Sequence, residues 1–428
     1  MQSVTLEAYA IARERYAEFG VDTETALAAL ASRSVSVHCW QGDDVAGFEA
    51  PDAALSGGGI QVTGSHPGRA RNAGELRMDL DKALSLVPGC HRLNLHAIYG
   101  EFRGAPVERD AIGIEHFRGW IDWARERKLG LDFNATLFSH PRAEAGFTLS
   151  SKDAETRRFW ITHVRRCREI AARMGAELDT PCIHNLWIPD GMKDQCVDRA
   201  GHRALLRDSL DAIYDRDPGG GLIKDAVESK LFGIGSESFV VGSHEFYLGY
   251  AMEKGLLPCL DLGHFHPTES VADKISALLP FCPELLLHVS RGVRWDSDHV
   301  VILDDPIREV ALEIVRAGAL DRVHLALDFF DASVNRVGAW VTGVRATIKA
   351  VLFALLEPTE RLRALETEGD YLGRMALLEE LRAMPFGAVW DYHCGRSGVP
   401  VGGAWIEPVR DYEKQVLSKR SVSLVPAP

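Results

Sequence analysis

Short apolar runs alternate along this chain with longer stretches in which apolar residues recur every three or four positions. Runs of four to eight apolar residues are typical of buried strands, and the longer period is typical of amphipathic helices. The predicted strands lie at 34–40, 92–96, 130–134, 181–186, 225–230, 256–261, 284–289 and 322–328. The predicted helices between them lie at 72–86, 114–127, 153–174, 204–214, 245–254, 271–279 and 306–317.

Eight strands alternating with helices predict an α/β protein whose parallel strands close into a (β/α)8 TIM barrel. Helical periodicity also covers 5–31 before the first strand, and 336–356 and 359–384 after the last. The section 390–419 is predicted to be irregular with a short helix. We therefore divide the chain into an N-terminal helical segment (1–33), a barrel catalytic domain (34–345) and a C-terminal helical extension (346–428) that could contact other subunits.

Composition narrows the class of ligand. The 428 residues carry a formal net charge of −13 and no block of lysine or arginine, which argues against nucleic acid and suits a neutral small molecule or a cation. The eight cysteines are scattered without a CxxC pair, as expected of reduced core residues. The N-terminus lacks a signal sequence and no stretch approaches a membrane span, so a cytoplasmic protein without a membrane partner is expected.

Metal-ligand residue types concentrate where the predicted strands end. Apolar runs lead directly into Asp261, His288 and Asp328, and Glu228 closes an earlier strand. In a barrel such residues converge on one mouth although they are far apart in sequence. His264, Asp296 and Asp298 lie in the loops beyond the strands and form a second group. The pattern predicts two neighbouring divalent ions.

Carboxylates dominate this set and imidazole comes second, which favours Mn²⁺ or Mg²⁺, with Co²⁺ or Zn²⁺ as alternatives. A single aspartate or histidine at a strand end is more often a helix cap or a hydrogen-bonded core residue. Seven together favour metal binding, because burying so many carboxylates without a cation would be costly. His266 and His299 could orient ligands or satisfy loop backbone, and His184, His324 and His393 are expected to be structural.

Other strand-end residues are candidates for binding or catalysis. Lys230 lies two residues after Glu228 and would share its face of an extended strand, where it could polarise a substrate oxygen or extend to solvent at the rim. His96 could transfer a proton or be a satisfied core histidine. The aromatic side chains could form pocket walls, although bulky aromatics are usually core. These are Trp40, Phe133, Trp187 and Phe329.

Several segments resemble the bacterial L-rhamnose isomerase family, and the resemblance covers essentially the whole chain. The segments are HCWQGDD (38–44), RLNLHAIY (92–99), WIPDGMKD (187–194), ESKLFGIG (228–235), DLGHFHPT (261–268), VRWDSDHVV (293–301) and LDFFDAS (327–333). Segments of this length are more specific than any metal motif. The chain matches the family at every ligand position.

The resemblance implies a cytoplasmic, tetrameric, manganese-dependent aldose–ketose isomerase with a barrel like that of xylose isomerase, acting on L-rhamnose. It implies that Glu228, Asp261, His288 and Asp328 hold a structural ion. It further implies that His264, Asp296 and Asp298 hold the catalytic ion, so that Asp296 is also catalytic. Lys230 would stabilise negative charge on O1 of the sugar, and His96 could act at the ring oxygen.

Two mechanisms and two other functions stay open on the sequence. A hydride shift between C2 and C1 is expected, yet an enediol path is also open because Asp, Glu and His can each serve as a base. A barrel endonuclease with several zinc ions has a similar rim, but the net charge of −13 speaks against it. A non-catalytic sugar-binding or assembly protein would return its sugar unchanged.

Overall fold

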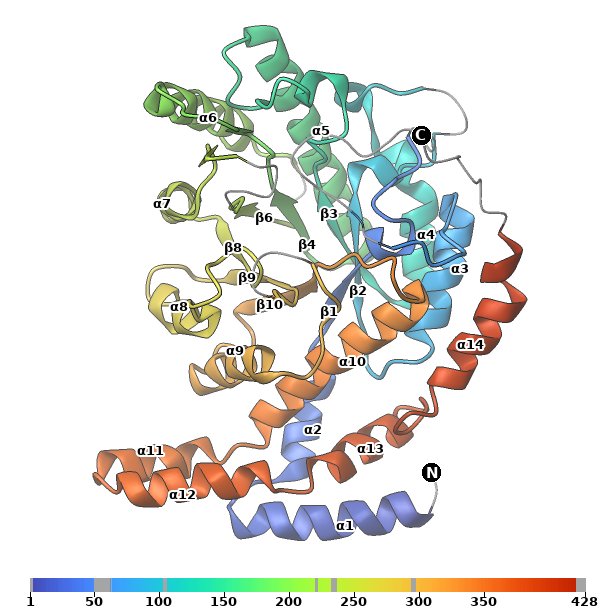
Figure 1. The fold of residues 1–428 in the computed structure, drawn as a ribbon, viewed down its shortest axis with the longest axis vertical. Helices are drawn as coiled ribbons and strands as arrows, with labels where there is room; N and C mark the ends of the chain where they lie inside the picture. The colour runs from blue at the N-terminus through green and yellow to red at the C-terminus, as the bar shows by residue number, and fades with distance from the viewer. Residues whose placement is uncertain are drawn as a thin grey trace.

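A computed structural model of the chain describes residues 3–49, 62, 64–102, 106–219, 222–231, 237–293 and 298–420. Eight parallel strands close into a barrel in the order β1-β10-β9-β8-β6-β4-β3-β2 (Figure 1). The strands are β1 (Val35–His38), β2 (Arg92–His96), β3 (Gly130–Asn134), β4 (Cys182–Leu186), β6 (Ile223–Glu228), β8 (Leu257–Asp261), β9 (Leu285–Val289) and β10 (Val323–Leu327). The predicted barrel is confirmed, with each strand close to its predicted position.

The apolar runs form strands because helices cover the outer face of the barrel and side chains fill its interior. Parallel pairing then fixes which strand ends lie side by side. Asp261 at the end of β8 pairs with His288 of β9, and His288 also pairs with Ala326 of β10. Chemistry-bearing residues from different strands are thereby brought to the carboxyl end of the barrel.

Helices with apolar inner faces surround the strands, in agreement with the predicted periodicity. Local signals fix their starts: Asp153 accepts a hydrogen bond from the Thr156 amide (2.8 Å) at the start of α5, and Asp304 caps α9. The surrounding helices are α3 (Ala73–Leu84), α4 (Arg118–Arg127), α5 (Ala154–Leu178), α6 (Arg199–Tyr214), α7 (His244–Lys254), α8 (Val271–Leu278), α9 (Asp305–Arg316) and α10 (Arg336–Leu355). Short 3₁₀ turns occur at η1 (Trp40–Gly42), η2 (Ala97–Tyr99), η3 (Arg109–Ala111), η4 (Ile114–Phe117), η5 (Pro141–Ala143) and η6 (Leu417–Lys419).

The flanking segments are helical, with two differences from the prediction. The N-terminal segment forms α1 (Ser3–Glu18) and α2 (Thr23–Ala31) as expected. The predicted single helix 359–384 is broken into α11 (Thr359–Thr367) and α12 (Tyr371–Arg382), because Gly369 adopts a φ of +77°. The expected irregular section instead contains two helices, α13 (Phe386–Arg396) and α14 (Ile406–Gln415).

Helices α1, α11, α12 and α13 lie below the barrel in the view of Figure 1, whereas α14 runs up one side of it. Tyr9 of α1 stacks on Tyr392 of α13, with ring centroids 3.7 Å apart. The pair α11 and α12 extends away from the barrel (Figure 1). The N-terminal segment and the C-terminal extension therefore pack together outside the barrel through α1 and α13.

Helix α10 bears on two predictions. It runs without interruption across residue 345, so the domain boundary predicted there falls inside one helix, and the division into domains stays a prediction. Contrary to the expectation from sequence, α10 is also long and apolar enough to cross a membrane by length and composition. Most of it is buried in the protein, which is typical of a core helix.

A small antiparallel sheet that the sequence did not predict joins the loops that follow β4 and β6. It consists of β5 (Gly191–Met192) and β7 (Phe239–Val240), with Gly191 opposite Val240. A side chain at Gly191 would bring its Cβ to 2.7 Å from the Phe239 carbonyl oxygen, so the close approach of the two strands requires glycine. The sheet fixes two loops of the barrel mouth to each other.

Candidate active site

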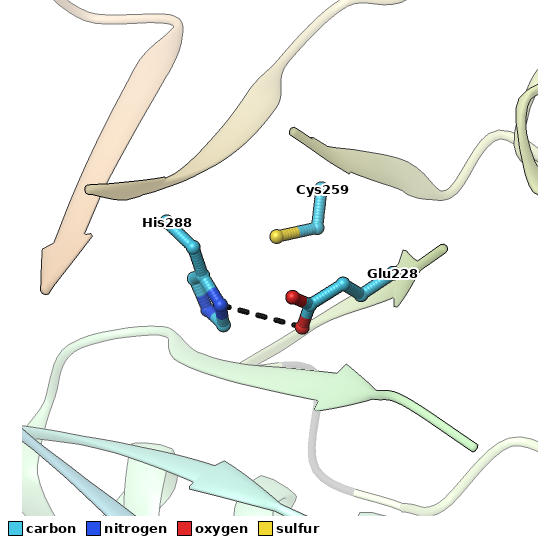
Figure 2. A group of neighbouring side chains, drawn as sticks. All are labelled: Glu228, Cys259 and His288. Atoms are coloured by element: carbon cyan, nitrogen blue, oxygen red, sulfur yellow. Dashed lines mark ion pairs between the residues drawn. The ribbon is translucent and has the colours of Figure 1, made fainter. Parts of the chain in front are cut away.

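Four predicted ligands converge at the carboxyl ends of β6, β8, β9 and β10. Nδ1 of His288 lies 3.0 Å from Oδ2 of Asp328, 3.3 Å from Oε2 of Glu228 and 3.8 Å from Oδ2 of Asp261. One ligand atom from each residue lies within 4.8 Å of those of the other three. Figure 2 shows Glu228 and His288 turned toward each other across the barrel interior. The structure assembles the whole set that the strand-end pattern predicted for one ion.

The electrostatics of this cluster suit a divalent cation. Glu228, Asp261 and His288 are buried, and the Asp328 side chain is 20% exposed. Burial favours neutral imidazole, but the neighbouring carboxylates of Glu228 and Asp328 raise the pKa of His288 well above its usual value. Burial opposes ionisation of Asp328 as well, yet its interaction with His288 lowers its pKa to about 2. Three carboxylates thus gather around a single imidazole.

The donor atoms themselves fit a metal ion. Both ring nitrogens of His288 are buried, and neither forms a well-directed hydrogen bond with the described residues. A buried polar atom without such a bond is costly, and coordination to a cation would satisfy it. Carboxylate oxygens with one imidazole favour hard or borderline ions such as Mn²⁺, Mg²⁺ or Co²⁺.

Cys259 lies beside the same cluster and was missed by the reasoning from sequence. Figure 2 shows Cys259 with Glu228 and His288. One ligand atom from each of the three side chains lies within 4.8 Å of those of the other two. Burial raises the pKa of Cys259, so its side chain is a neutral thiol. A signal was present, since Cys259 precedes Asp261 by two residues and therefore shares its face of the strand.

The predicted second ion site is described only in part. Nδ1 of His264 lies 3.5 Å from Oε1 of Glu228, so His264 borders the first cluster. The Asp298 carbonyl accepts a hydrogen bond from the Phe330 amide (3.2 Å), which ties its loop to the end of β10. Asp296 lies outside the described residues. Joint coordination by these three side chains stays a prediction.

Lys230 is buried near the mouth and does not extend to solvent, so the rim alternative is wrong. Its Nζ donates a hydrogen bond to the Pro189 carbonyl (2.9 Å) and forms an ion pair with Glu237. Nζ also lies 5.9 Å from the ring centroid of Trp187. Burial lowers the pKa of Lys230, while Glu237 acts in the opposite direction.

A row of aromatic rings connects this lysine to the cluster of Glu228, Asp261, His288 and Asp328. Ring centroids are 6.1 Å apart for Trp187 and Phe138, 5.6 Å for Phe138 and His96, and 4.9 Å for His96 and Trp40. The Trp40 indole N–H then donates to Oδ1 of Asp328 (3.0 Å). Trp40, His96 and Trp187 were predicted at the site. Phe138 was not predicted there, because it lies in the loop after β3 and not at the end of the strand.

His96 is neutral in this setting. Its Nδ1 lies 3.1 Å from the Thr136 hydroxyl, and burial lowers its pKa to about 3. Its role in proton transfer stays a prediction. A neutral imidazole can still donate or accept a hydrogen bond at a substrate oxygen.

Two predicted pocket residues belong to the protein core. Phe133 is fully buried, and its ring packs edge to face on Phe117, with centroids 4.9 Å apart. Phe329 is also fully buried and fills the space beside Gly343 of α10, where an added Cβ would lie 2.5 Å from its ring. These contacts favour the core alternative for both residues, and their role as pocket walls stays a prediction. Asp132 and Asn134 bond to Arg92 and Asn94 of the neighbouring strand β2, so the pleat turns Phe133 to the opposite face.

Comparison with known proteins gives matches over nearly the whole chain. The family described as L-rhamnose isomerase (RhaA) matches residues 4–420. The chain is 59% identical over 417 residues to an L-rhamnose isomerase of Rhodopirellula baltica, covering 97% of each protein. It is 57% identical over 417 residues to an L-rhamnose isomerase of Salmonella paratyphi B, covering 97% of this chain and 99% of that one. A solved L-ribulose 3-epimerase aligns at 11% identity with a TM-score of 0.46, covering 78% of this chain and 97% of that one.

Proposed function

This chain belongs to the L-rhamnose isomerase family, and on that premise we propose that it converts the aldose L-rhamnose to the ketose L-rhamnulose in carbohydrate degradation. The main support is that the family matches residues 4–420. That span contains the converging cluster of Glu228, Asp261, His288 and Asp328. A family match without an assembled site would support the fold alone.

We propose that two divalent ions take part and that Mn²⁺ occupies both sites. Glu228, Asp261, His288 and Asp328 would hold the structural ion, and the loop residues His264, Asp296 and Asp298 the catalytic one. When bound, such ions polarise the carbonyl of the open-chain sugar and the hydroxyl next to it. Support comes from the hard donor set and from the buried imidazole nitrogens of His288.

The remaining chemistry falls to side chains of this protein. Ring opening moves the proton of the O1 hydroxyl to the ring oxygen, beside which the neutral His96 would donate or accept a hydrogen bond. Isomerisation moves a hydrogen from C2 to C1 and a proton from O2 to O1. Lys230 would stabilise negative charge on O1 by donating a hydrogen bond. Trp40, Phe138 and Trp187 would exclude water from the reacting carbons.

We further propose that the enzyme works in the cytoplasm as a homotetramer. The C-terminal extension would take part in subunit contacts, and the exposure of apolar side chains on α12 supports this assignment. Tyr371, Leu372 and Met375 are 61%, 72% and 63% exposed in the single chain. Light scattering of the purified protein measures the assembly directly, and a monomer at micromolar concentration would contradict the proposal.

The decisive experiment compares metal-free and metal-loaded protein. The purified protein is stripped with a chelator, dialysed and incubated with L-rhamnose with and without Mn²⁺. Ketose should form only in the sample with metal. Sugar recovered unchanged in both samples would overturn the proposed activity and favour a binding protein, whereas tight binding of duplex DNA would favour the endonuclease alternative.

A further inference from the structure

The loops around Lys230 are held together by backbone hydrogen bonds that do not belong to the barrel. The Lys230 amide donates to the Gly242 carbonyl (3.0 Å), and the Val241 amide donates to the Asp190 carbonyl (3.0 Å). The Ser238 amide donates to the Met192 carbonyl (3.1 Å). Together with the pairing of β5 and β7, these bonds form a lattice that joins residues 189–192 and 237–242 to each other and to Lys230 after the end of β6.

Asp190 anchors this lattice to the barrel. Its buried carboxylate accepts hydrogen bonds from the hydroxyls of Thr148 (2.5 Å) and Ser150 (2.6 Å) and from the Ser150 amide (3.0 Å). A carboxylate bound by three donors inside the protein holds its backbone in one place. Pro189, the residue before it, is thereby fixed, and so is the carbonyl that contacts Lys230.

The Lys230 ammonium lies between two acceptors supplied by these loops. Pro189 provides a carbonyl oxygen at 2.9 Å, and Glu237 provides a carboxylate. The side chains of Lys230 and Glu237 are 1% and 8% exposed. A buried ammonium requires such a partner, and the pair has no net charge. Glu237 follows the end of β6 by nine residues, so the pattern of residues at strand ends did not predict it as part of the site.

The number of N–H donors on Lys230 suggests that its ion pair with Glu237 does more than stabilise the fold. A lysine ammonium has three N–H donors. Two are used by Pro189 and Glu237 among the described residues, which leaves one for a substrate oxygen. The aromatic row from Trp187 to Trp40 joins this ammonium to Asp328, so the lysine and the ligand cluster share one mouth.

We propose that Glu237 is a positioning residue for the isomerisation: together with the Pro189 carbonyl it holds the Lys230 ammonium so that its remaining N–H is directed at O1 of the open-chain sugar. This inference rests on the proposed function, from which the role of Lys230 is taken. Glu237 itself does not touch the sugar. It acts by fixing the one donor whose charge stabilises the transition state.

The test is a comparison of Glu237→Gln with wild type on L-rhamnose. Glutamine keeps the shape and one acceptor but removes the charge that holds the ammonium. We expect kcat to fall roughly tenfold to a hundredfold, because displacement of a catalytic donor by about 1 Å has effects of that size. KM should change by less than about threefold, since the lost interaction operates mainly in the transition state. Manganese content should equal that of wild type.

A double-mutant cycle separates positioning from a merely structural role. Lys230→Met alone should remove most activity, and adding Glu237→Gln to it should lower the residual kcat no further. A structural glutamate would reduce activity by the same factor in both backgrounds. Glu253→Gln is the matched control, because Glu253 forms an exposed ion pair with Arg207 on α6 and should leave kcat unchanged.

The outcomes are distinct. If the wild-type protein forms ketose and Glu237→Gln has the same kcat, the inference is overturned and the proposed function stands. A wild-type protein that forms no ketose would overturn the proposed function, and the inference with it. If Glu237→Gln fails to fold, Glu237→Asp retains the charge but shortens its reach: a kcat lowered about tenfold at unchanged KM supports positioning, and a wild-type kcat overturns it.

Discussion

The indole N–H of Trp40 donates a hydrogen bond to Oδ1 of Asp328 over 3.0 Å, while Oδ2 of the same carboxylate lies 3.0 Å from His288. One aspartate therefore contacts both the aromatic row and the ligand cluster. The donor fixes the orientation of the carboxylate, and groups that orient metal ligands in this way contribute to metal affinity.

Replacing this donor should weaken metal binding. Trp40→Phe keeps an aromatic ring next to His96 but removes the N–H. We expect the affinity for Mn²⁺ to fall about tenfold to a hundredfold, as is usual for loss of a group that orients a ligand, and calorimetric titration of the metal-free protein measures it. Trp123→Phe is the control, because the Trp123 N–H has no hydrogen-bond partner among the described residues. Equal affinities in both variants would contradict the assigned role.

Removing two predicted ligands of the catalytic ion should abolish turnover without unfolding the protein. Asp296→Asn combined with Asp298→Asn keeps the side-chain shapes but removes two negative charges from a loop. We expect no measurable ketose and loss of about one manganese ion per subunit by elemental analysis. Circular dichroism and melting temperature should match wild type. Global unfolding of the double variant would show that these carboxylates are structural.

Isotope labelling distinguishes the two routes for hydrogen transfer. In a hydride shift the hydrogen of C2 moves directly to C1, so a reaction run in D₂O gives L-rhamnulose without deuterium on C1. An enediol path passes the proton through a base, which exchanges with solvent. We expect no incorporation at early times by proton NMR. Deuterium on C1 in the first product formed would establish the enediol path.

Acid should destabilise the fold partly through His163. Its Nε2 accepts a hydrogen bond from the Thr136 amide (3.1 Å), and its Nδ1 lies 2.9 Å from the Arg109 carbonyl, an arrangement that needs neutral imidazole. Burial, with a smaller effect of Arg109, lowers its pKa to about 3. An unfolded histidine titrates near 6.5, so between about 6.5 and 3 the unfolded state binds the additional proton.

The resulting stability is fully present above pH 6.5 and is lost as the pH falls toward 3. One such group should cost about 1.4 kcal/mol per pH unit in that window. His163→Gln retains a donor and an acceptor but cannot titrate. Denaturant unfolding at pH 8 and pH 5 should show a smaller pH-dependent loss for the variant than for wild type. Identical losses would assign the acid sensitivity to other groups.

The candidate site was predictable to the extent that it depends on strand ends. Glu228, Asp261, His288 and Asp328 were found from sequence because each closes an apolar run, and parallel strands bring their carboxyl ends to one edge. The pleat decided what strand counting could not. It turns Phe133 away from the mouth and toward Phe117. A one-residue change of position reverses the face that a side chain occupies.

The loop residues of the site could not be predicted from the sequence for another reason. Phe138 and Glu237 contact the site through the path of the chain after β3 and β6, which backbone bonds to distant segments determine. The break at Gly369 depends on a positive φ that a glycine permits but does not require. Local preference in such places allows several conformations, and long-range contacts select one.

The sequence by itself determined the barrel, its eight strands, the candidate ligands at their ends and the family to which the chain belongs. These depend on periodicity and on residue identity, which are local properties. Only the tertiary structure decided that Lys230 is buried against Glu237, that His96 is neutral and that Trp40 bonds to Asp328. Burial, charge state and hydrogen-bond partners arise when distant segments exclude water together, so no stretch of sequence contains them.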